Sequence, residues 1–412
     1  MKILVQKFGG TSLATYELRQ RVIHHIRNGL NEGYQLVVVV SAMGRKGDPY
    51  ATDTLLDLIN QNGRSLQPRE RDLLLSCGEI ISATTLSSML HREGIDNTVL
   101  TGGQAGIITN HQHNNAQIIT INPSRIRQEL NKGKVVIVAG FQGKTTDGEI
   151  TTLGRGGSDT TATALGVALG AELVDIFTDV DGIMTADPRI VEDAVPLETV
   201  TYTEMCNLAF QGAKVIHPRA VEIAMQTNVP IRVRSTMTDN PGTLVTSTSE
   251  VTRLAGEVQD RLITGITQVP NVTQIKVKAK EGQYDFQLKV FKAMAENGIS
   301  VDFINVNPSG VAYTVFDELA DRAEEILRSL GFEPELHRHC AKVSAVGAGI
   351  AGVPGAMAKM VEALTEEDIQ ILQSADSHTT LWVLVRGEDM VKAVRALHRK
   401  FELHNIHYQT AE

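Results

Sequence analysis

The sequence has little cysteine, with only Cys77, Cys206 and Cys340 among its 412 residues. Their wide spacing matches neither a zinc-binding motif nor the disulfide framework of a small secreted protein. We therefore expect the protein to fold in a reducing compartment, with no metal held by cysteine. We also expect the three thiols to be small buried hydrophobic groups.

Long apolar runs and a surplus of basic residues are also missing. No apolar run approaches the roughly 20 residues that a membrane-spanning helix needs, and the N-terminus has no apolar signal segment. We therefore expect a cytoplasmic protein that does not bind membranes. The 39 Lys and Arg residues are outnumbered by 48 Asp and Glu, giving a net charge of -9. This balance argues against a nucleic-acid partner, because phosphate backbones require clustered basic residues.

What the sequence does contain is a glycine-rich segment at 151–161, which includes Gly154-Arg155-Gly156-Gly157-Ser158-Asp159. An alanine-rich stretch follows, up to residue 170, and predicts a helix. The N–H groups at a helix N-terminus attract anions, and Arg155 adds a planar fork that suits a carboxylate or phosphate. The alternative is a glycine-rich turn in which Ser158 or Asp159 is an ordinary helix cap.

A second glycine-containing loop follows the first predicted strand, at residues 2–5, and reads Lys7-Phe8-Gly9-Gly10-Thr11-Ser12. It is not a Walker A loop, because the lysine precedes the glycines. Lys7 is nevertheless well placed to meet a phosphate held by the backbone of Gly9 and Gly10. The alternative is a surface lysine beside a turn.

Apolar strands recur at 36–40, 135–139 and 173–177, with helical segments between them. This alternation predicts a three-layer α/β/α domain with a mainly parallel sheet. Ligands bind at the carboxyl ends of such strands, where the sequence places Ser41 and an acidic loop at 178–189. The carboxylates of this loop could hold hydrated Mg²⁺ or the hydroxyls of a nucleotide sugar. A hairpin with Asp147-Gly148 at its turn is expected at 145–152.

A predicted helix at 68–91 contains Gly78 beside Glu79. Glycine destabilises a helix interior by about 1 kcal/mol, so Gly78 suggests a close approach of other atoms beside Glu79. The alternative places Glu79 on a solvated helix face. His111 and His113 lie two residues apart without a carboxylate at ligand spacing, so we expect a structural loop there and predict no metal site in the chain.

The C-terminal region has a different pattern. From about residue 262, the order strand, helix, strand, strand, helix occurs twice with a period of about 70 residues, which predicts paired βαββαβ, ferredoxin-like units. We expect a first domain at 1–245, a linker at 246–261 and two small domains at 262–337 and 338–412. No constellation of catalytic type recurs in the repeats, so we interpret them as regulatory or oligomerising.

Five motifs in order identify a family. They are Lys7 to Ser12, Ser76 to Glu79, Gly154 to Asp159, Thr178 to Gly182, and Asp187 to Arg189. Together they resemble the aspartokinases of the amino-acid kinase superfamily, and the tail resembles the tandem ACT domains of the monofunctional bacterial type. The closest likeness is to the Gram-positive type that serves diaminopimelate and lysine synthesis.

The resemblance implies an ATP- and Mg²⁺-dependent kinase that phosphorylates the β-carboxylate of L-aspartate to 4-phospho-L-aspartate. It implies catalytic roles for Lys7 and Asp159, with Asp159 orienting Lys7. The residues it implies for aspartate binding are Ser41, Thr52, Glu79, Arg155, Gly156 and Ser158. Those it implies for nucleotide binding are Lys7, Phe8, Gly9, Gly10, Thr178, Asp179, Met184, Arg189 and Lys214. Family members often have an aromatic residue where Met184 stands.

The ACT resemblance implies feedback control by lysine, threonine or diaminopimelate, and assembly into a homo-oligomer of at least two chains. The residues expected to hold the effector are Asn297, Ile299, Asp302 and Gln373.

Three other functions remain open at this point. Another amino-acid kinase could act on acetylglutamate, glutamate or a nucleoside monophosphate, but Glu79 with Arg155 favours a free amino acid. A non-catalytic amino-acid sensor is opposed by intact Lys7, Arg155 and Asp159. A dinucleotide dehydrogenase is opposed by the absence of G-x-G-x-x-G after the first strand.

Overall fold

The computed structural model describes residues 2–60, 66–250, 262–279, 285–350 and 353–405. The chain divides into two compact units. Unit 1 comprises 1–183, 196–209 and 214–259, and unit 2 comprises 184–195, 210–213 and 260–412. Most of the predicted linker, residues 251–261, lies outside the described residues.

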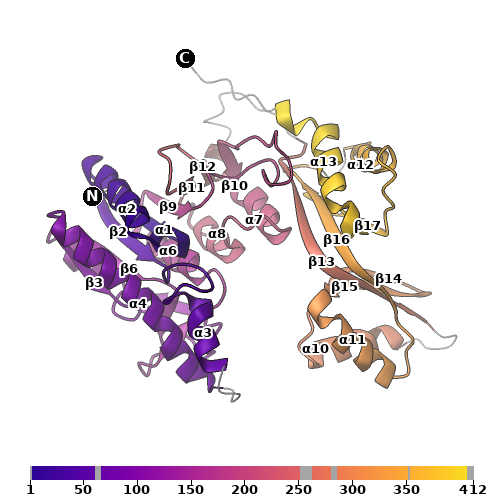
Figure 1. Cartoon of the computed structure of the whole chain (residues 1–412), viewed down its shortest axis with the longest axis horizontal. Helices are drawn as coiled ribbons and strands as arrows, with labels where there is room; N and C mark the ends of the chain where they lie inside the picture. The colour runs from indigo at the N-terminus through magenta and orange to yellow at the C-terminus, as the bar shows by residue number, and fades with distance from the viewer. Residues whose placement is uncertain (1, 61–65, 251–261, 280–284, 351–352, 406–412) are drawn as a thin grey trace. The chain divides into compact units, whose positions relative to one another are not determined.

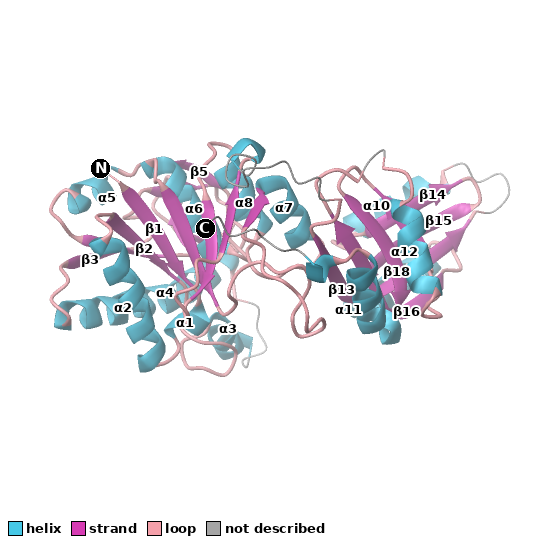
Figure 2. Ribbon diagram, turned by 90° about the horizontal axis from the view of Figure 1, so that it is seen from above, coloured by secondary structure: helices cyan, strands magenta, loops and turns pink. Residues whose placement is uncertain are grey.

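Unit 1 is built on an eight-stranded sheet with the strand order β10-β12-β11-β9-β1-β2-β6-β3 (Figures 1 and 2). β1, β2, β3, β6, β9 and β11 run parallel, while β12 pairs antiparallel with β11 and parallel with β10. The strands are β1 (Ile3–Phe8), β2 (Gln35–Val40), β3 (Asn97–Leu100), β6 (Val135–Ala139), β9 (Leu173–Thr178), β10 (Thr199–Thr201), β11 (Ile231–Ser235) and β12 (Thr243–Thr246).

Helices cover both faces of this sheet. Leu36, Val38 and Val40 of β2 lie in one core with residues of α2 and α4, and Val37 and Val39, which alternate with them, are also fully buried. The predicted three-layer, mainly parallel fold is therefore confirmed. The helices are α1 (Gly10–Leu13), α2 (Tyr16–Asn31), α3 (Thr52–Asn60), α4 (Pro68–Arg92), α5 (Ser124–Leu130), α6 (Gly157–Leu169), α7 (Tyr202–Phe210) and α8 (Pro218–Met225).

A small sheet of β5-β4-β7-β8 leads the chain into α6. Its strands are β4 (Ile107–Thr109), β5 (Ile118–Ile121), β7 (Gln142–Lys144) and β8 (Ile150–Thr152). β7 and β8 pair antiparallel, which confirms the predicted hairpin.

α4 is long and apolar enough to cross a membrane by length and composition, although no such run was expected from the sequence. Half of its most apolar window is buried inside the structure, and Asp72 and Glu79 are among its buried residues. An isolated charged side chain is not buried among lipid tails without a partner, whereas it can be satisfied inside a protein core. We therefore interpret α4 as the core helix of a soluble protein.

Unit 2 contains one six-stranded sheet with the order β14-β15-β13-β16-β18-β17. Its strands are β13 (Gly265–Lys278), β14 (Asp302–Asn307), β15 (Gly310–Phe316), β16 (Glu335–Val346), β17 (Gln373–Asp376) and β18 (Thr380–Arg386). The helices are α10 (Phe286–Glu296), α11 (Asp317–Ser329), α12 (Ala356–Thr365) and α13 (Met390–Lys400), with short 3-10 turns η1 (Gly387–Asp389) and η2 (Leu403–Asn405). The predicted double repeat of strand, helix, strand, strand, helix is confirmed.

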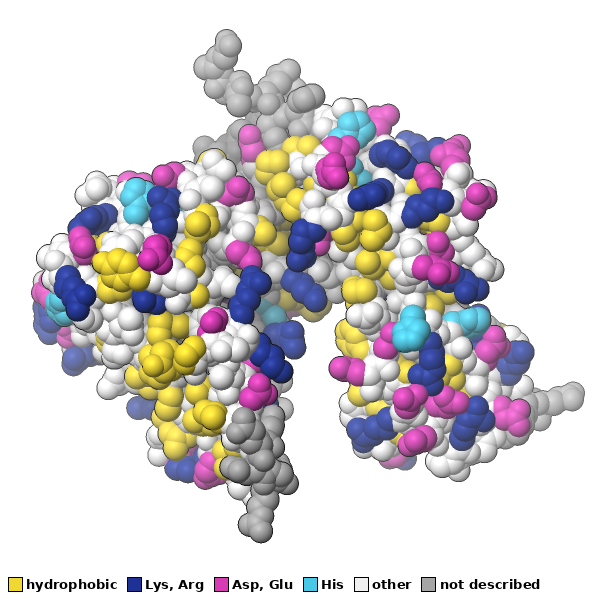
Figure 3. Space-filling view, viewed as in Figure 1, with side chains coloured by type: hydrophobic (Ala, Val, Ile, Leu, Met, Phe, Trp, Pro, Cys, Tyr) yellow, Lys and Arg dark blue, Asp and Glu magenta, His cyan; other side chains and the backbone are white. Residues whose placement is uncertain are grey.

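The two repeats share their long strands. Residues 265–269 of β13 pair with 342–346 of β16, and 272–276 continue this pairing with 335–340 of β16. Residues 272–278 of β13 also pair with β15. The predicted domain boundary at 337/338 falls inside β16. On the face of unit 2 seen in Figure 3, basic side chains are interspersed with acidic ones, so that this face has no continuous basic surface.

The expectation that all three cysteines are buried is wrong for Cys77. Cys340 is buried and Cys206 is partly buried, but Cys77 is exposed on α4. The opposite side of α4 provides the buried residues, because a helix that lies on a sheet turns one face to solvent.

Candidate active site

The centre of the candidate site is an ion pair between Lys7 and Asp159. Lys7 Nζ lies 2.7 Å from Asp159 Oδ1, and each side chain is 12% exposed. Lys7 is the penultimate residue of β1, and Asp159 lies in the first turn of α6, where the helix dipole favours a negative charge. The backbone N–H of His217, the N-cap residue of α8, donates to Asp159 Oδ2 at 3.3 Å. Asp159 is thus held between a cation and a backbone donor.

Two loops at the carboxyl ends of neighbouring strands pack closely beside this pair. Gly44 N donates to Gly10 O at 2.9 Å, and Ser41 N donates to Phe8 O at 3.1 Å. A Cβ atom on Gly10 would lie 2.5 Å from the carbonyl oxygen of Ala42. A Cβ on Gly9 would be 3.6 Å from Lys7 Nζ, so the backbone of Gly9 lies next to the ammonium group.

Gly10→Ala is expected to destabilise unit 1 by about 1–3 kcal/mol, because the added methyl group meets backbone atoms that cannot rotate away. Urea unfolding followed by circular dichroism measures this change. Gly349→Ala is the matched control, since a Cβ there meets nothing within 4 Å. Equal stability of the two variants would contradict the described packing of the Gly10 loop.

The glycines before α6 adopt conformations that other residues rarely adopt. Gly154 and Gly156 have φ of 75° and 68°, and a Cβ on Gly156 would lie 2.2 Å from the His217 side chain. Gly156 is the N-cap of α6, and no side chain caps this helix. The alternative in which Ser158 or Asp159 is an ordinary cap is therefore not observed. Both of these residues are buried, whereas Arg155 is exposed between the two glycines.

Glu79 is buried, so the alternative of a solvated helix face is wrong. Its side chain accepts a hydrogen bond from Ala42 N at 3.1 Å through Oε1, and its buried Oε2 has no partner in the part of the chain that the structure describes. Burial raises the pKa of Glu79 from 4.5 to about 8, although the Ala42 hydrogen bond opposes this shift. The expected close approach at Gly78 is confirmed, since a Cβ there would lie 2.8 Å from Ala42 Cβ. An unpartnered carboxyl oxygen of this kind is suited to receive a cation.

Sequence reasoning missed Asp72, a fully buried carboxylate on α4. It accepts hydrogen bonds from Thr152 Oγ1 at 2.5 Å and from Asn114 N at 3.0 Å, and it pairs with His113 Nδ1 at 2.8 Å. Asp72 therefore fixes the loop around His113 against the strand that leads into α6. His111 pairs with a different carboxylate, that of Asp147. The structural loop expected around His111 and His113 is thus observed, and its partners lie 36 and 41 residues away, where no local spacing reveals them.

The acidic loop after β9 begins at the same edge of the sheet, since a Cβ on Gly9 would lie 3.7 Å from Phe177 O. Asp179 pairs with Arg45 at 2.6 Å and accepts a hydrogen bond from Thr178 Oγ1 at 3.2 Å. Thr52 begins α3, and Lys214 is exposed just before α8.

Two of the predicted nucleotide-binding residues, Met184 and Arg189, belong to unit 2. The guanidinium of Arg189 binds both carboxylate oxygens of Asp187, at 3.0 and 2.8 Å. The other predicted active-site residues belong to unit 1.

Comparison with known proteins identifies the family. Residues 2–235 match the amino acid kinase family, and residues 335–399 match an ACT domain. The chain is 60% identical to aspartokinase 1 of Bacillus subtilis over 403 residues, which cover 98% of this chain and 100% of that protein. The structure of E. coli aspartokinase III in complex with aspartate and ADP (R-state) is similar, with a TM-score of 0.79, 25% identity and coverage of 97% of this chain and 99% of that one. The complex of the same enzyme with lysine and aspartate (T-state) gives a TM-score of 0.75 at 25% identity, over 97% of this chain and 100% of that one. The chain therefore belongs to the aspartokinase family, the ATP-dependent kinases that phosphorylate aspartate.

Proposed function

We propose that the enzyme transfers the γ-phosphoryl group of ATP to the β-carboxylate of L-aspartate and so begins the lysine, threonine and methionine (diaminopimelate) pathway in the cytoplasm. The observation that carries this proposal is the Lys7–Asp159 ion pair at the N-terminus of α6, in the same sheet-edge site as Glu79 with its unpartnered oxygen. Such a site offers a cation for the phosphates and an anion for the ammonium group of a free amino acid.

The proposed reaction needs positioning and charge neutralisation rather than a nucleophilic side chain. A β-carboxylate oxygen attacks the γ-phosphorus, and the bond from this phosphorus to the β,γ-bridging oxygen breaks, so that ADP leaves with the electron pair. The attacking carboxylate is already ionised at neutral pH, and no proton needs to move. Lys7 stabilises the charge on the transferring group, and Asp159 positions Lys7.

The glycine loops support a phosphate site. Gly9 places its backbone next to Lys7, Gly10 lets the same loop pack against the carbonyl groups of Ala42 and Gly44, and the N-terminus of α6 has no side-chain cap. We assign the phosphates to these groups together with Phe8, and the rest of the nucleotide to Thr178, Asp179, Met184, Arg189 and Lys214. Mg²⁺, which enters with ATP, neutralises phosphate charge, and the exposed Asp179 carboxylate is the kind of ligand that it accepts.

For L-aspartate we assign the α-carboxylate to Arg155, whose exposed guanidinium can form two parallel hydrogen bonds. We assign the ammonium group of L-aspartate to Glu79. The carboxyl group of Glu79 ionises when this cation binds beside Oε2. Ser41, Thr52, Gly156 and Ser158 line the rest of the substrate site.

Substrate choice among amino-acid kinases is tested by measuring ADP release with L-aspartate, L-glutamate and N-acetyl-L-glutamate. We expect turnover with L-aspartate, because its free ammonium group matches Glu79. Turnover that is faster with N-acetyl-L-glutamate would overturn the proposal, since that compound has no ammonium group.

The effector site is assigned to unit 2, with lysine, threonine or diaminopimelate as the ligand. Gln373 on β17 donates to the Phe303 carbonyl at 2.5 Å and accepts from Gln274 at 2.7 Å, next to Asp302, which pairs with Lys342. Asn297 ends α10, and Ile299 is buried just after it. We further propose that the ACT units join the chains of a homo-oligomer.

Gln373→Ala is expected to weaken inhibition by the effector at least tenfold, because it removes a polar side chain that holds two strands together. The concentration of each amino acid that halves the activity is the measurement, and Gln287→Ala on α10 is the control. Unchanged inhibition by all three amino acids would exclude Gln373 from the effector site.

A further inference from the structure

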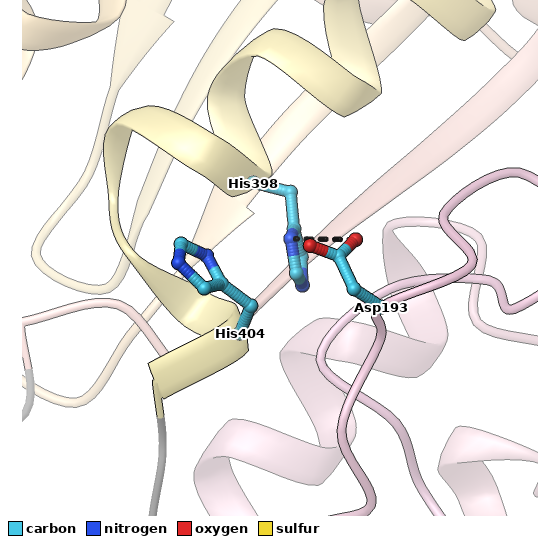
Figure 4. Close-up of side chains that lie close together, drawn as sticks. All are labelled: Asp193, His398 and His404. Carbon is cyan, nitrogen blue, oxygen red and sulfur yellow. Dashed lines mark ion pairs between the residues drawn. The ribbon is translucent and has the colours of Figure 1, made fainter.

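A cluster of two imidazoles and one carboxylate lies in unit 2, outside the candidate active site. It consists of His398 in the last turn of α13, His404 in η2 and Asp193 in the segment 184–195 (Figure 4). One potential ligand atom from each residue lies within 4.8 Å of the other two. Among the described residues, this is the one group of His, Cys, Asp and Glu with such a spacing.

The two imidazoles each have a buried nitrogen that lacks a hydrogen-bond partner. His398 is fully buried, and neither its Nδ1 nor the Nδ1 of His404 has a hydrogen-bond partner among the described residues. The Asp193 carboxylate lies 4.0 Å from His398 Nδ1, which is too far for a hydrogen bond. Buried polar atoms are almost always satisfied, so two orphaned nitrogens side by side indicate a missing ligand.

The other nitrogen of His398 is fixed. Nε2 lies 2.9 Å from Thr185 Oγ1, and Val195 N donates to the same hydroxyl oxygen at 3.0 Å. Metal-bound imidazoles commonly donate through their second nitrogen to an oxygen acceptor, which fixes the ring and leaves the first nitrogen with its lone pair. Thr185 can accept in this way, because a hydroxyl oxygen has two lone pairs.

The protonation state of His398 also suits a metal ligand. Burial lowers the pKa of His398, so the imidazole is neutral near pH 7, as metal coordination requires. The neighbouring Asp193 opposes this shift, and His404 adds to it.

The donor set defines the class of cation. Two imidazole nitrogens with one carboxylate suit Zn²⁺ and similar late first-row divalent ions, whereas Mg²⁺ and Ca²⁺ prefer oxygen ligands. Tetrahedral bonds of about 2.0–2.1 Å place ligand atoms about 3.3 Å apart, so these atoms, which now lie within 4.8 Å of one another, must approach by up to about 1.5 Å. The Asp193 side chain is 60% exposed, so its carboxylate is free to move towards the imidazoles.

We propose that Asp193, His398 and His404 bind one zinc-class divalent cation, with water as the fourth ligand. The ion joins the segment 184–195 to the C-terminal end of α13. This segment already contacts α13 through the Arg395 side chain, which donates to Ile190 O at 2.7 Å. The bound ion therefore adds a second link between α13 and the segment 184–195, which contains Arg189.

The test is calorimetric titration of Zn²⁺ into the chelator-treated full-length protein, without nucleotide or amino acid. We expect one Zn²⁺ per chain, with affinity at least tenfold weaker in Asp193→Asn and at least a hundredfold weaker in His404→Gln. Glu192→Gln and His378→Gln are the matched controls, because both residues are exposed in unit 2 and lie outside the cluster. Zn²⁺ should raise the melting temperature of the wild type and of the controls, but not that of the two cluster variants.

Co²⁺ absorption then distinguishes this site from a cysteine site. We expect visible d–d bands of a site with nitrogen and oxygen ligands, without the intense near-ultraviolet band of a thiolate ligand. Stoichiometric binding that is unaffected by both cluster variants, a thiolate band, or no stoichiometric binding would each overturn the proposal. Asp193→Asn decides the outcome if His404→Gln fails to fold, because the Asp193 side chain is exposed.

Discussion

Lys7→Ala is expected to lower kcat by about 10²–10³-fold or more, which corresponds to roughly 3–4 kcal/mol in the barrier. The reason is electrostatic. Lys7 Nζ is the partly buried cation next to the backbone of Gly9, where the phosphates are assigned. Its interaction strengthens as charge develops on the transferring group, so kcat should fall more than the affinity for ATP. Steady-state kinetics at saturating L-aspartate and ATP measure the change.

Lys2→Ala is the control for this experiment, because Lys2 is 66% exposed and pairs with Glu172 on the surface. Loss of Lys7 also leaves Asp159 without its cation, so the melting temperature of each variant is measured alongside the kinetics. Lys7→Gln separates the two effects, since it keeps a polar group beside Asp159 while it removes the charge. Near-normal turnover in a folded Lys7 variant would show that the role assigned to Lys7 is wrong.

Glu79→Gln is expected to raise the KM for L-aspartate and to abolish its dependence on pH. With a pKa of about 8, Glu79 is mostly protonated at pH 7 in the free enzyme, whereas the substrate ammonium binds the ionised form. The KM of the wild type should therefore fall as pH rises towards 8, by up to about tenfold per pH unit. Kinetics between pH 6 and pH 9, at roughly unit intervals, record this slope. A slope that persists in the variant would assign the titration to another group.

The carboxyl group of Glu79 also makes the stability of the folded protein depend on pH. Between pH 4.5 and about 8, the folded protein keeps a proton on Glu79 that the unfolded chain has released. Stability of the ligand-free enzyme should therefore fall as pH rises through this window, by at most about 1.4 kcal/mol per pH unit from this group. Glu79→Gln should lose this contribution, whereas Glu70→Gln should keep it, because Glu70 lies in the first turn of α4 with its side chain 43% exposed. Urea unfolding at several pH values compares the three proteins.

Local patterns predicted most of the fold. The apolar run of β2 fits a strand buried on both faces, and β13 to α13 follow the predicted double repeat. Local patterns could not predict that residues 265–269 pair with 342–346, because this pairing joins segments about 77 residues apart. The sharing of β13 and β16 between the two repeats follows from this non-local pairing.

Some residues of the candidate site were likewise predictable from local sequence patterns, and others were not. Lys7 precedes Gly9 and Gly10 at the end of a predicted strand, and this local signal was enough to select it. The role of Asp159, which follows Gly156 and Gly157, was implied by the family resemblance. The buried environment of Glu79 was suggested only by Gly78, since the packing of Ala42 against α4 is a tertiary contact. Asp72 and the cluster of Asp193, His398 and His404 had no local signal, because their members come from distant parts of the chain.

The most direct test of the account is to trap the product of the wild-type enzyme with hydroxylamine, in the presence of ATP, Mg²⁺ and L-aspartate, and to identify the hydroxamate by mass spectrometry. Transfer to the β-carboxylate predicts β-aspartyl hydroxamate, formed in proportion to ADP and lost in Lys7→Ala. The absence of an aspartate-dependent hydroxamate, or formation of the α-hydroxamate, would contradict the assignment of Arg155 to the α-carboxylate and of Lys7 to the transferring phosphoryl group.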